Sequence, residues 1–323
     1  MAGVAALLWL TVAGTQAPQQ SARFSKPPES TPTGYRKLAT RPCTDTLAVV
    51  GTDTLRAARD NVAADSAMNA GRAAALPKPP DTTAVFQFRY VRNKSFGIGE
   101  RLVFDVNYGF ITAGEAVMEI PAYDSVAGRR CFRVEFRVNS LPSFSWIYRV
   151  ADRYLTFIDE QTIAPWKFEQ HVREGNYSRD FVADFDQIHN VAHTTEGSYP
   201  IPKYVHDIMS AFYYARTVDY SNLKTGDQYT LFNFYRDKTY ELAVKVLGRQ
   251  ELEVEAGTFR TIVVEPMVKE GGLFKSEGRI VIWLTDDDRK IPVRVNTKVI
   301  IGSIDTELRE YSGLRGPLGA KIR

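Results

Sequence analysis

The chain has 323 residues, of which 44% are hydrophobic and 24% are charged. These values are typical of a globular protein and argue against a fibrous or largely disordered chain. Because 41 Lys and Arg residues face 38 Asp and Glu residues, the formal charge is only +3, so we expect no nucleic-acid partner.

The first segment, residues 1–17, carries no charge and contains an apolar run at residues 4–10 followed by small residues. This pattern resembles the apolar and cleavage regions of a secretory signal, although no basic residue precedes the run. The run is also shorter than the roughly 20 apolar residues that a transmembrane helix needs. We therefore expect an exported protein of the periplasm or cell envelope, and not an integral membrane protein.

Residues 18–84 are rich in Pro, Ser, Thr and Ala, and we predict a disordered linker there because the prolines interrupt regular structure. The two cysteines of the chain are Cys43, inside this linker, and Cys131. An exported location would allow them to pair, the alternative is two unrelated thiols, and the sequence leaves both open. Neither has a Cys or His neighbour at metal-binding spacing, so zinc is not expected.

An antiparallel β domain is predicted for residues 85–312, where apolar and polar residues alternate. The alternation is clearest at residues 132–138, Phe-Arg-Val-Glu-Phe-Arg-Val, and it indicates strands with one buried and one solvated face. Short turn signals separate about a dozen such runs, which favours an antiparallel over a parallel sheet. The other runs are residues 102–108, 154–158, 167–173, 181–185, 229–235, 242–246, 259–264, 279–284, 293–301 and 304–311. Residues 313–323 are assigned to a disordered tail.

One segment departs from this alternation. After Pro202, apolar residues recur at helical spacing at Val205, Ile208, Met209 and Phe212, which predicts a helix over residues 204–217. A single amphipathic helix among many strands must bury its apolar face, and the concave surface of a curved sheet is available for that. The predicted fold is therefore mainly β: a strongly curved antiparallel sheet or half-open β-barrel with one amphipathic helix packed in its concave face.

Several short motifs between residues 96 and 311 resemble the bacterial family called domain of unknown function 3108 (DUF3108). They are GERL at 99–102, AGEA at 113–116, DIMSAFYYAR at 207–216, AGTF at 256–259, IWLTDD at 282–287 and IGSI at 301–304. The resemblance implies an exported envelope protein with a curved antiparallel sheet, similar in broad shape to periplasmic lipoprotein-localisation carriers. It implies no known reaction.

The four histidines, His171, His189, His193 and His206, fall within one short portion of the chain and raise the hypothesis of a metal site. If residues 187–194 form a strand, His189 and His193 lie about 13 Å apart, at about 3.3 Å per residue, which is too far to share a zinc ion. We favour surface histidines and expect no metal or other cofactor.

Two further motifs invite sharper hypotheses. The acidic cluster at residues 286–288 could hold calcium, but it lacks the alternating spacing of a calcium loop, so we favour a polar turn whose Asp side chains accept backbone hydrogen bonds. Ser210 follows His206 by one helical turn, which would suit a nucleophile and its base. No Gly-x-Ser-x-Gly motif accompanies them, and a small residue where a helix crosses a sheet explains Ser210 as well.

Aromatic residues are abundant after residue 86 and could line a pocket between the helix and the sheet, because the mouth of an open barrel is a common ligand site. The residues we select for this apolar site are Trp146, Tyr148, Trp166, Met209, Phe212, Tyr213 and Trp283.

Three functions remain open. The first is a non-catalytic protein that binds a lipid, another apolar or amphipathic ligand, or a polypeptide in the half-barrel. The second is a structural or assembly module that docks onto another envelope protein. The third is a hydrolase of unknown class that uses Ser210 and His206. We favour the first and expect no enzyme.

Overall fold

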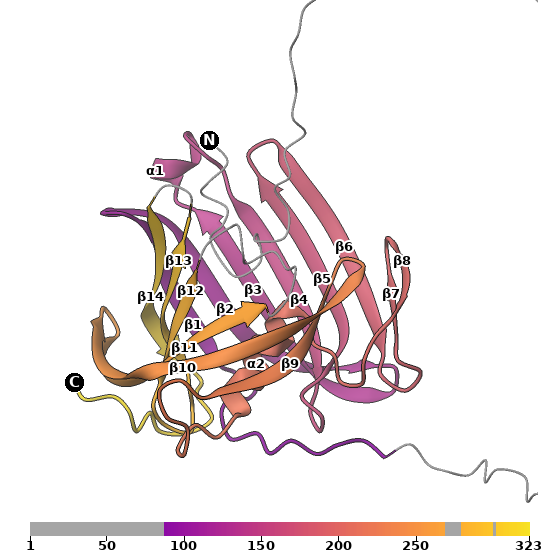
Figure 1. The fold of residues 1–323 in the computed structure, drawn as a ribbon. Helices are drawn as coiled ribbons and strands as arrows, with labels where there is room; N and C mark the ends of the chain where they lie inside the picture. Colours follow the sequence, from indigo (N-terminus) through magenta and orange to yellow (C-terminus); the bar gives the residue numbers. More distant parts are fainter. Residues whose placement is uncertain (1–86, 269–278, 300–301) are drawn as a thin grey trace, which may run out of the picture. The chain divides into compact units, whose positions relative to one another are not determined.

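The computed structural model describes residues 87–268, 279–299 and 302–323, and within these ranges it consists of one large antiparallel sheet and two short helices (Figure 1). The fourteen strands form a single sheet that is not closed into a barrel, which confirms the predicted fold class. The strands are β1 Arg101–Tyr108, β2 Ile111–Val126, β3 Arg129–Ser140, β4 Ala151–Asp159, β5 Pro165–Glu174, β6 Tyr177–Asp186, β7 Val191–Thr194, β8 Gly197–Pro200, β9 Gln228–Tyr235, β10 Lys238–Val254, β11 Gly257–Val268, β12 Ile280–Thr285, β13 Pro292–Lys298 and β14 Ser303–Ser312. The helices are α1 Pro142–Ser145 and α2 Ile208–Thr217.

The order of the strands explains how one chain makes so wide a sheet. Strands β1 to β8 follow each other as a meander, β9 to β14 form a second meander, and β14 pairs with β1 to join the two. Every pairing between neighbouring strands is antiparallel, as short turns between successive strands require. The two free edges of the sheet are therefore β8 and β9, which are close in sequence and are connected through α2.

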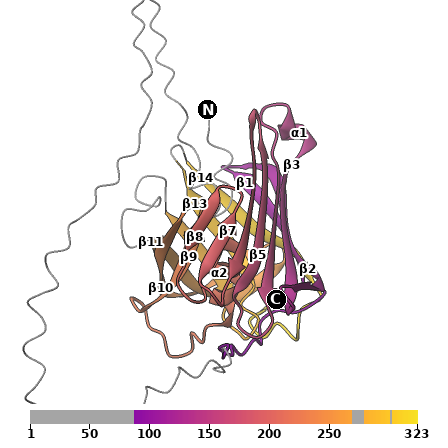
Figure 2. The same ribbon diagram turned by 90° about the vertical axis from the view of Figure 1, so that its right-hand side faces the viewer.

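The sheet curves strongly, so that its two edges approach each other (Figures 1 and 2). Phe234 of β9 packs against Phe185 of β6 and Tyr199 of β8, with ring centroids 5.9 Å and 6.1 Å apart. The backbone of His206, just before α2, donates to Phe232 and accepts from Phe234 at 2.9 Å and 2.7 Å. These ring contacts and one parallel bridge, between His206 and Asn233 of β9, hold the two edges near each other. Within the described sheet, strands β8 and β9 do not pair with each other.

The alternating pattern places the core on the concave face. In β3, Phe132, Val134, Phe136 and Val138 are buried in the main hydrophobic core. Charged residues between them form ion pairs on the other face, where Glu135 accepts from Arg137 at 2.9 Å and from Arg153 of β4 at 2.8 Å. Cross-strand pairs of opposite charge of this kind support the register of neighbouring strands.

Helix α2 begins later than predicted, at Ile208 rather than at residue 204. The reason is Asp207, whose carboxylate caps the helix by accepting from the backbone amides of Met209 and Ser210 at 2.8 Å and 2.9 Å. Residues before this cap are non-helical, and His206 bonds to β9 instead. The helix is also buried on most sides rather than along one stripe, because Ser210 and Arg216 are buried together with its apolar residues.

An N-terminal strap, residues 87–100, crosses the end of the sheet that carries α2, which we call the helix end. Glu100 of this strap forms two bonds to Arg216 of α2, at 2.7 Å and 2.8 Å, and both side chains are almost fully buried. The Ser95 hydroxyl donates to the Arg216 carbonyl at 2.5 Å, and Phe96 packs edge-on against Tyr213 at 4.8 Å. These contacts join the strap to the helix and cover the core.

The opposite end of the sheet, which we call the rim, carries the β1–β2 turn at residues 109–110, helix α1 and the β5–β6 turn at residues 175–176. Both views place α1 at the other end of the sheet from α2 (Figures 1 and 2). None of the helices in the described ranges combines the length and the apolar character that crossing a bilayer would require.

Several smaller predictions need correction. Strands β2, β7 and β8 and helix α1 were not among the predicted elements. Residues 313–323, which were predicted to form a disordered tail, lie along β11, where the Arg260 amide donates to the Ala320 carbonyl at 2.9 Å and Ala320 is fully buried. The C-terminal segment is held by backbone hydrogen bonds to residues 258 and 260 of β11. Such bonds do not depend on side-chain type, so the sequence pattern does not show them. The signal-like segment 1–17, the linker 18–84 and Cys43 lie outside the described residues, and Cys131 is a buried free thiol.

Candidate functional site

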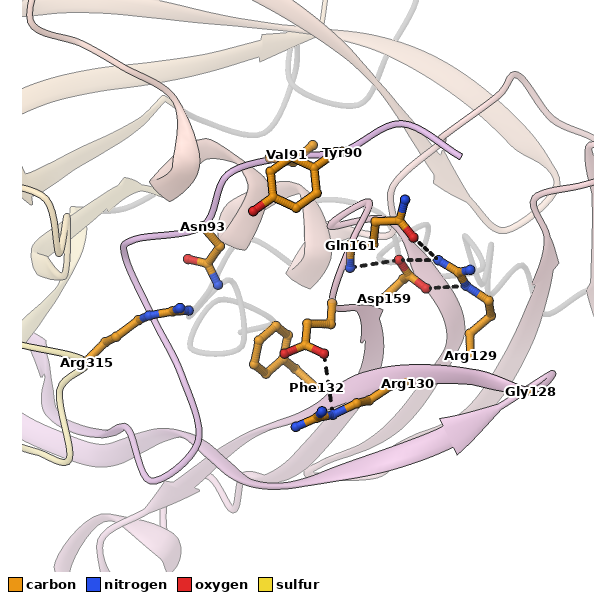
Figure 3. A pocket seen from close by; sticks show the side chains of 11 residues that line it. Tyr90, Val91, Asn93, Gly128, Arg129, Arg130, Phe132, Asp159, Gln161 and Arg315 are labelled. Atoms are coloured by element: carbon orange, nitrogen blue, oxygen red, sulfur yellow. Dashed lines mark hydrogen bonds and ion pairs between the residues drawn. The ribbon is translucent and has the colours of Figure 1, made fainter. Parts of the chain in front are cut away.

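A pocket of about 470 Å³ lies at the helix end, between the N-terminal strap, the β2–β3 turn and the β4–β5 turn (Figure 3). Its volume is within the range of small-molecule sites, roughly 300–1,000 Å³. The pocket is lined by Tyr90, Val91, Asn93, Gly128, Arg129, Arg130, Phe132, Asp159, Glu160, Gln161 and Arg315.

Most charges on the pocket wall are paired with each other. Arg129 donates two bonds to Asp159, at 2.6 Å and 3.0 Å, and Arg130 lies 3.4 Å from Glu160. The Glu160 carboxylate also accepts a hydrogen bond from the Tyr123 hydroxyl at 2.8 Å. These pairs fix the two turns against each other and leave little free charge on this side of the pocket.

Arg315 is different, because it adds a positive charge that nothing in the pocket balances. Its guanidinium donates to the Phe96 carbonyl at 3.2 Å, and the part of the chain that the structure describes provides no ion-pair partner for it. In Figure 3 its side chain extends from the C-terminal segment toward the pocket. Three arginines therefore face two carboxylates, and the pocket has an excess of one positive charge.

The floor of the pocket is aromatic. Phe132 is buried and contacts Phe96, with ring centroids 5.4 Å apart, and Phe96 in turn contacts Tyr213 of α2. Tyr90 stands at the mouth with three quarters of its surface exposed. The pocket thus combines an apolar floor and an aromatic mouth with one unbalanced cation.

A second polar cluster lies on the concave face toward the rim. Asp152 of β4 and Glu174 of β5 are both buried, and burial together with their proximity raises the pKa of Glu174 above the usual carboxyl range. Burial likewise raises the pKa of Asp152. One oxygen of Glu174 and the side-chain oxygen of nearby Gln170 lack a hydrogen-bond partner within the described residues. The pair can therefore share one proton at neutral pH.

The residues selected from the sequence do not line one pocket. Met209, Phe212 and Tyr213 of α2 are brought together in the main core. Trp166 lies in a separate small cluster with Cys131, Leu155 and Phe157, and Phe88 of the strap covers it. These residues fill space between packed elements.

The other three selected residues lie elsewhere. Tyr148 packs at the margin of the main core, and its ring would contact a side chain placed at Gly175. Trp283 of β12 pairs across the sheet with Arg294, whose guanidinium lies 5.9 Å from its ring centroid. Trp146 follows α1 and is 81% exposed.

The side chains of Ser210 and His206 contact other residues, and no hydrogen bond joins the two within the described structure. The Ser210 hydroxyl donates to the Asp207 carbonyl at 3.1 Å. The His206 ring packs at a tilt against Tyr214, with ring centroids 4.9 Å apart, and its Nε2 lies 3.5 Å from Arg89. Burial, together with the charge of Arg89, holds the pKa of His206 well below its ordinary range. The imidazole is therefore neutral at neutral pH. Its neighbours Tyr214 and Arg89 belong to α2 and the N-terminal strap.

The histidines and the acidic cluster also have local partners. His171 contacts Asp180 at 2.8 Å, His189 contacts Asp186 at 2.6 Å, and His189 lies in a turn rather than in the strand considered above. Asp287 accepts from the amides of Arg289 and Lys290, as expected of a polar turn. Among the described residues, no group of three or more His, Cys, Asp or Glu side chains is placed to hold a metal ion.

The pocket at the helix end was not predicted from the sequence. Its lining comes from segments near residues 90, 129, 160 and 315, and only the fold brings these together. The one local signal was Arg129 and Arg130 next to the turn glycine Gly128. Arg315 was hidden because it belongs to the segment assigned to a disordered tail.

Comparison with solved structures finds matches at low sequence identity and with TM-scores below 0.5. A β-barrel-like protein of domain of unknown function DUF1849 from Brucella abortus has a TM-score of 0.44 and 12% identity, covering 69% of this chain and 98% of that one. A candidate lipoprotein from Parabacteroides distasonis has a TM-score of 0.31 and 12% identity, covering 70% and 100%. A candidate exported protein with a YmcC-like fold from Bacteroides fragilis has a TM-score of 0.28 and 11% identity, with the same coverage.

Comparison of the sequence gives the family. No curated protein matches the chain. The family model described as protein of unknown function (DUF3108) matches residues 103–309, which is more than half of the chain and includes all strands from β2 to β13 together with α2. Of the six motifs noted in the sequence, all but GERL at 99–102 lie within this range. The chain therefore belongs to the DUF3108 family.

Proposed function

We propose that this chain is an exported, non-catalytic binding protein whose pocket at the helix end takes a small amphipathic molecule bearing an acidic group. The observation that carries the proposal is the unpaired Arg315 beside the aromatic floor formed by Phe132. An anionic group is favoured next to an unbalanced guanidinium, because a charge-assisted bond is stronger than a neutral one. The apolar part of the ligand would lie on the floor.

The polar wall supports the same class of ligand. Asp159 is held by Arg129 and also accepts from the Gln161 and Thr162 amides at 3.0 Å and 2.8 Å, so its position is well determined. A preorganised wall lowers the entropic cost of binding. The export of the protein is supported by the signal-like segment at residues 1–17.

The test is a binding titration of the purified full chain with a fluorescent fatty acid and with its neutral methyl ester. We expect Arg315→Gln to weaken binding of the acid about tenfold, which corresponds to ~1.4 kcal/mol, and to leave the ester unchanged. Arg279→Gln is the matched control, because it also removes one positive charge but lies on the surface in a pair with Glu265.

Two results would contradict the proposal. One is equal affinity of the native chain for the acid and the ester. The other is the same loss of acid binding in Arg315→Gln and Arg279→Gln, because net charge alone would then explain it.

A further inference from the structure

The rim exposes apolar side chains on two turns. Phe110, in the β1–β2 turn, is 108% exposed, and its neighbour Ile111 is 59% exposed. Trp146 and Ile147, directly after α1, are 81% and 58% exposed. Single exposed apolar residues are common on proteins, but four on two turns of the same end form a contiguous feature that is usually an interaction site.

The two turns are neighbours in space. The Leu141 amide, at the start of α1, donates to the Ala113 carbonyl of β2 at 2.9 Å. This bond places α1 beside the beginning of β2, and hence beside the turn that carries Phe110 and Ile111. We call these four residues, Phe110, Ile111, Trp146 and Ile147, the rim tip.

The α1 side of the rim tip is a defined structure. The Ser145 hydroxyl donates to the Leu141 carbonyl at 2.8 Å, and the Trp146 indole N–H donates to the Ser143 carbonyl at 2.9 Å. Because the polar atom of the indole is satisfied within the turn, its ring can enter an apolar environment without losing a hydrogen bond to water.

The two segments that carry the rim tip have no acidic side chain. Residues 107–112 and 141–149 contain no Asp or Glu. Exposed basic residues at this end of the sheet include Arg149, after α1, and Lys298, at the end of β13, which is separated from β1 only by β14. On the intervening strand β14, Asp305 lies opposite Asn107, and its carboxylate accepts from the Asn296 side chain at 2.8 Å. Apolar side chains next to the exposed Arg149 and Lys298 complement the interface of an anionic lipid bilayer.

We propose that the rim tip docks this protein onto the surface of an anionic phospholipid bilayer, with Phe110 and Trp146 inserted at the level of the headgroups. A lipid surface fits better than a protein partner, because four side chains on two protruding turns are few for a stable protein interface, which has roughly 20–30 residues a side. Docking through the rim would leave the pocket at the helix end on the side away from the bilayer.

The proposal is tested by co-sedimentation of the purified full chain with vesicles of phosphatidylethanolamine and phosphatidylglycerol, and with vesicles of phosphatidylcholine alone. We expect binding to the anionic vesicles, weakened by salt, and a shift of Trp emission to shorter wavelength that Trp146→Phe removes. The double variant Phe110→Ser/Trp146→Ser should bind at least about tenfold more weakly, because two large apolar side chains no longer leave water.

The matched control is Phe232→Ser, which removes an exposed phenylalanine of β9 that lies outside the rim tip. Segments outside the rim, including residues 1–17, are the same in all variants, so the difference between variants reports on the rim tip. Thermal unfolding of each variant checks that it is folded.

Three outcomes would overturn the proposal. They are no binding of the native chain to anionic vesicles, equal binding of Phe110→Ser/Trp146→Ser and the native chain, and an equal loss with Phe232→Ser. Arg315→Gln should retain vesicle binding, so failure of the pocket proposal and failure of this one are distinguishable.

Discussion

The helix end and the rim differ in which side chains they bury: the helix end buries charged residues, and the rim exposes large apolar ones. At the helix end, Arg216, Glu100 and Asp207 are buried, and each charged group has bonded partners. At the rim, Phe110 and Trp146 stand in solvent although they are large and apolar. The buried charges of the helix end join the strap to α2 and to the core, whereas the exposed side chains of the rim tip are free to present a surface.

The largest expected effect is at the buried ion pair of the helix end. Arg216→Ala leaves Glu100 buried without its partner, and we expect the free energy of unfolding to fall by about 3–5 kcal/mol. Urea denaturation measures it. Arg279→Ala, which breaks a surface pair with Glu265, should cost no more than about 1 kcal/mol. Equal losses in the two variants would mean that the helix end has no special role in stability.

The cap of α2 comes next. Asp207→Ala removes the acceptor of two helix amides and of the Thr156 hydroxyl, which lies at 2.7 Å. We expect a loss of about 2–3 kcal/mol in urea denaturation, from the missing cap and the buried groups left unpaired. Asp186→Ala removes an acceptor from the exposed turn before His189 and should cost less. A loss below that of the control would contradict the capping role.

The acid pair on the concave face predicts a pH dependence. In the folded state, burial beside Asp152 raises the pKa of Glu174 above its unfolded value, so the proton is favoured by folding. The stability that this proton provides is complete below the unfolded pKa and is lost as the pH rises through the folded one. Between about pH 5 and pH 8 the free energy of unfolding of the native chain should therefore decrease by about 1–2 kcal/mol more than that of Glu174→Gln, which has no proton to lose at this position.

The measurement is thermal or urea unfolding of the native chain and of Glu174→Gln across that pH range. Glu253→Gln, at an exposed position of β10, is the control and should follow the native chain. Parallel curves for all three proteins would show that the pair does not share a buried proton.

The smallest expected effect is on stability at the rim. Phe110→Ser and Trp146→Ser should each change the free energy of unfolding by no more than about 0.5 kcal/mol, because these side chains lose little contact with the core. The same urea titrations used for the helix end provide the measurement. A loss approaching that of Asp207→Ala would show that the rim tip is part of the packed structure, and the contrast between the two ends would disappear.

The strands and their faces were predictable where the alternation was regular. In β3, the pattern assigned Phe132 and Phe136 to the core and Glu135 and Arg137 to the other face, as the structure has them. Strand β2 was missed because Gly114 and Pro121 interrupt its pattern, and the register shifts between Glu119 and Ala122. Short strands such as β7 have too few residues to show a period.

The candidate sites were much less predictable. Trp146 was expected in an apolar pocket because the mouth of an open barrel is a common ligand site, yet the turn after α1 holds it at the rim. Arg216 and Glu100 look like surface residues in the sequence, and 116 positions separate them. Their burial depends on the strap crossing the helix end, which no local pattern records.

The class of fold could be predicted because the period of apolar residues is a local property that each strand and the helix carry in their own residues. Which ends of the strands form the packed helix end and which form the exposed rim depends instead on contacts between distant segments. Such contacts also gather Arg129, Phe132 and Arg315 around one pocket. These juxtapositions arise from long-range pairing, above all that of β1 with β14, and such pairing depends on the whole sheet rather than on any segment.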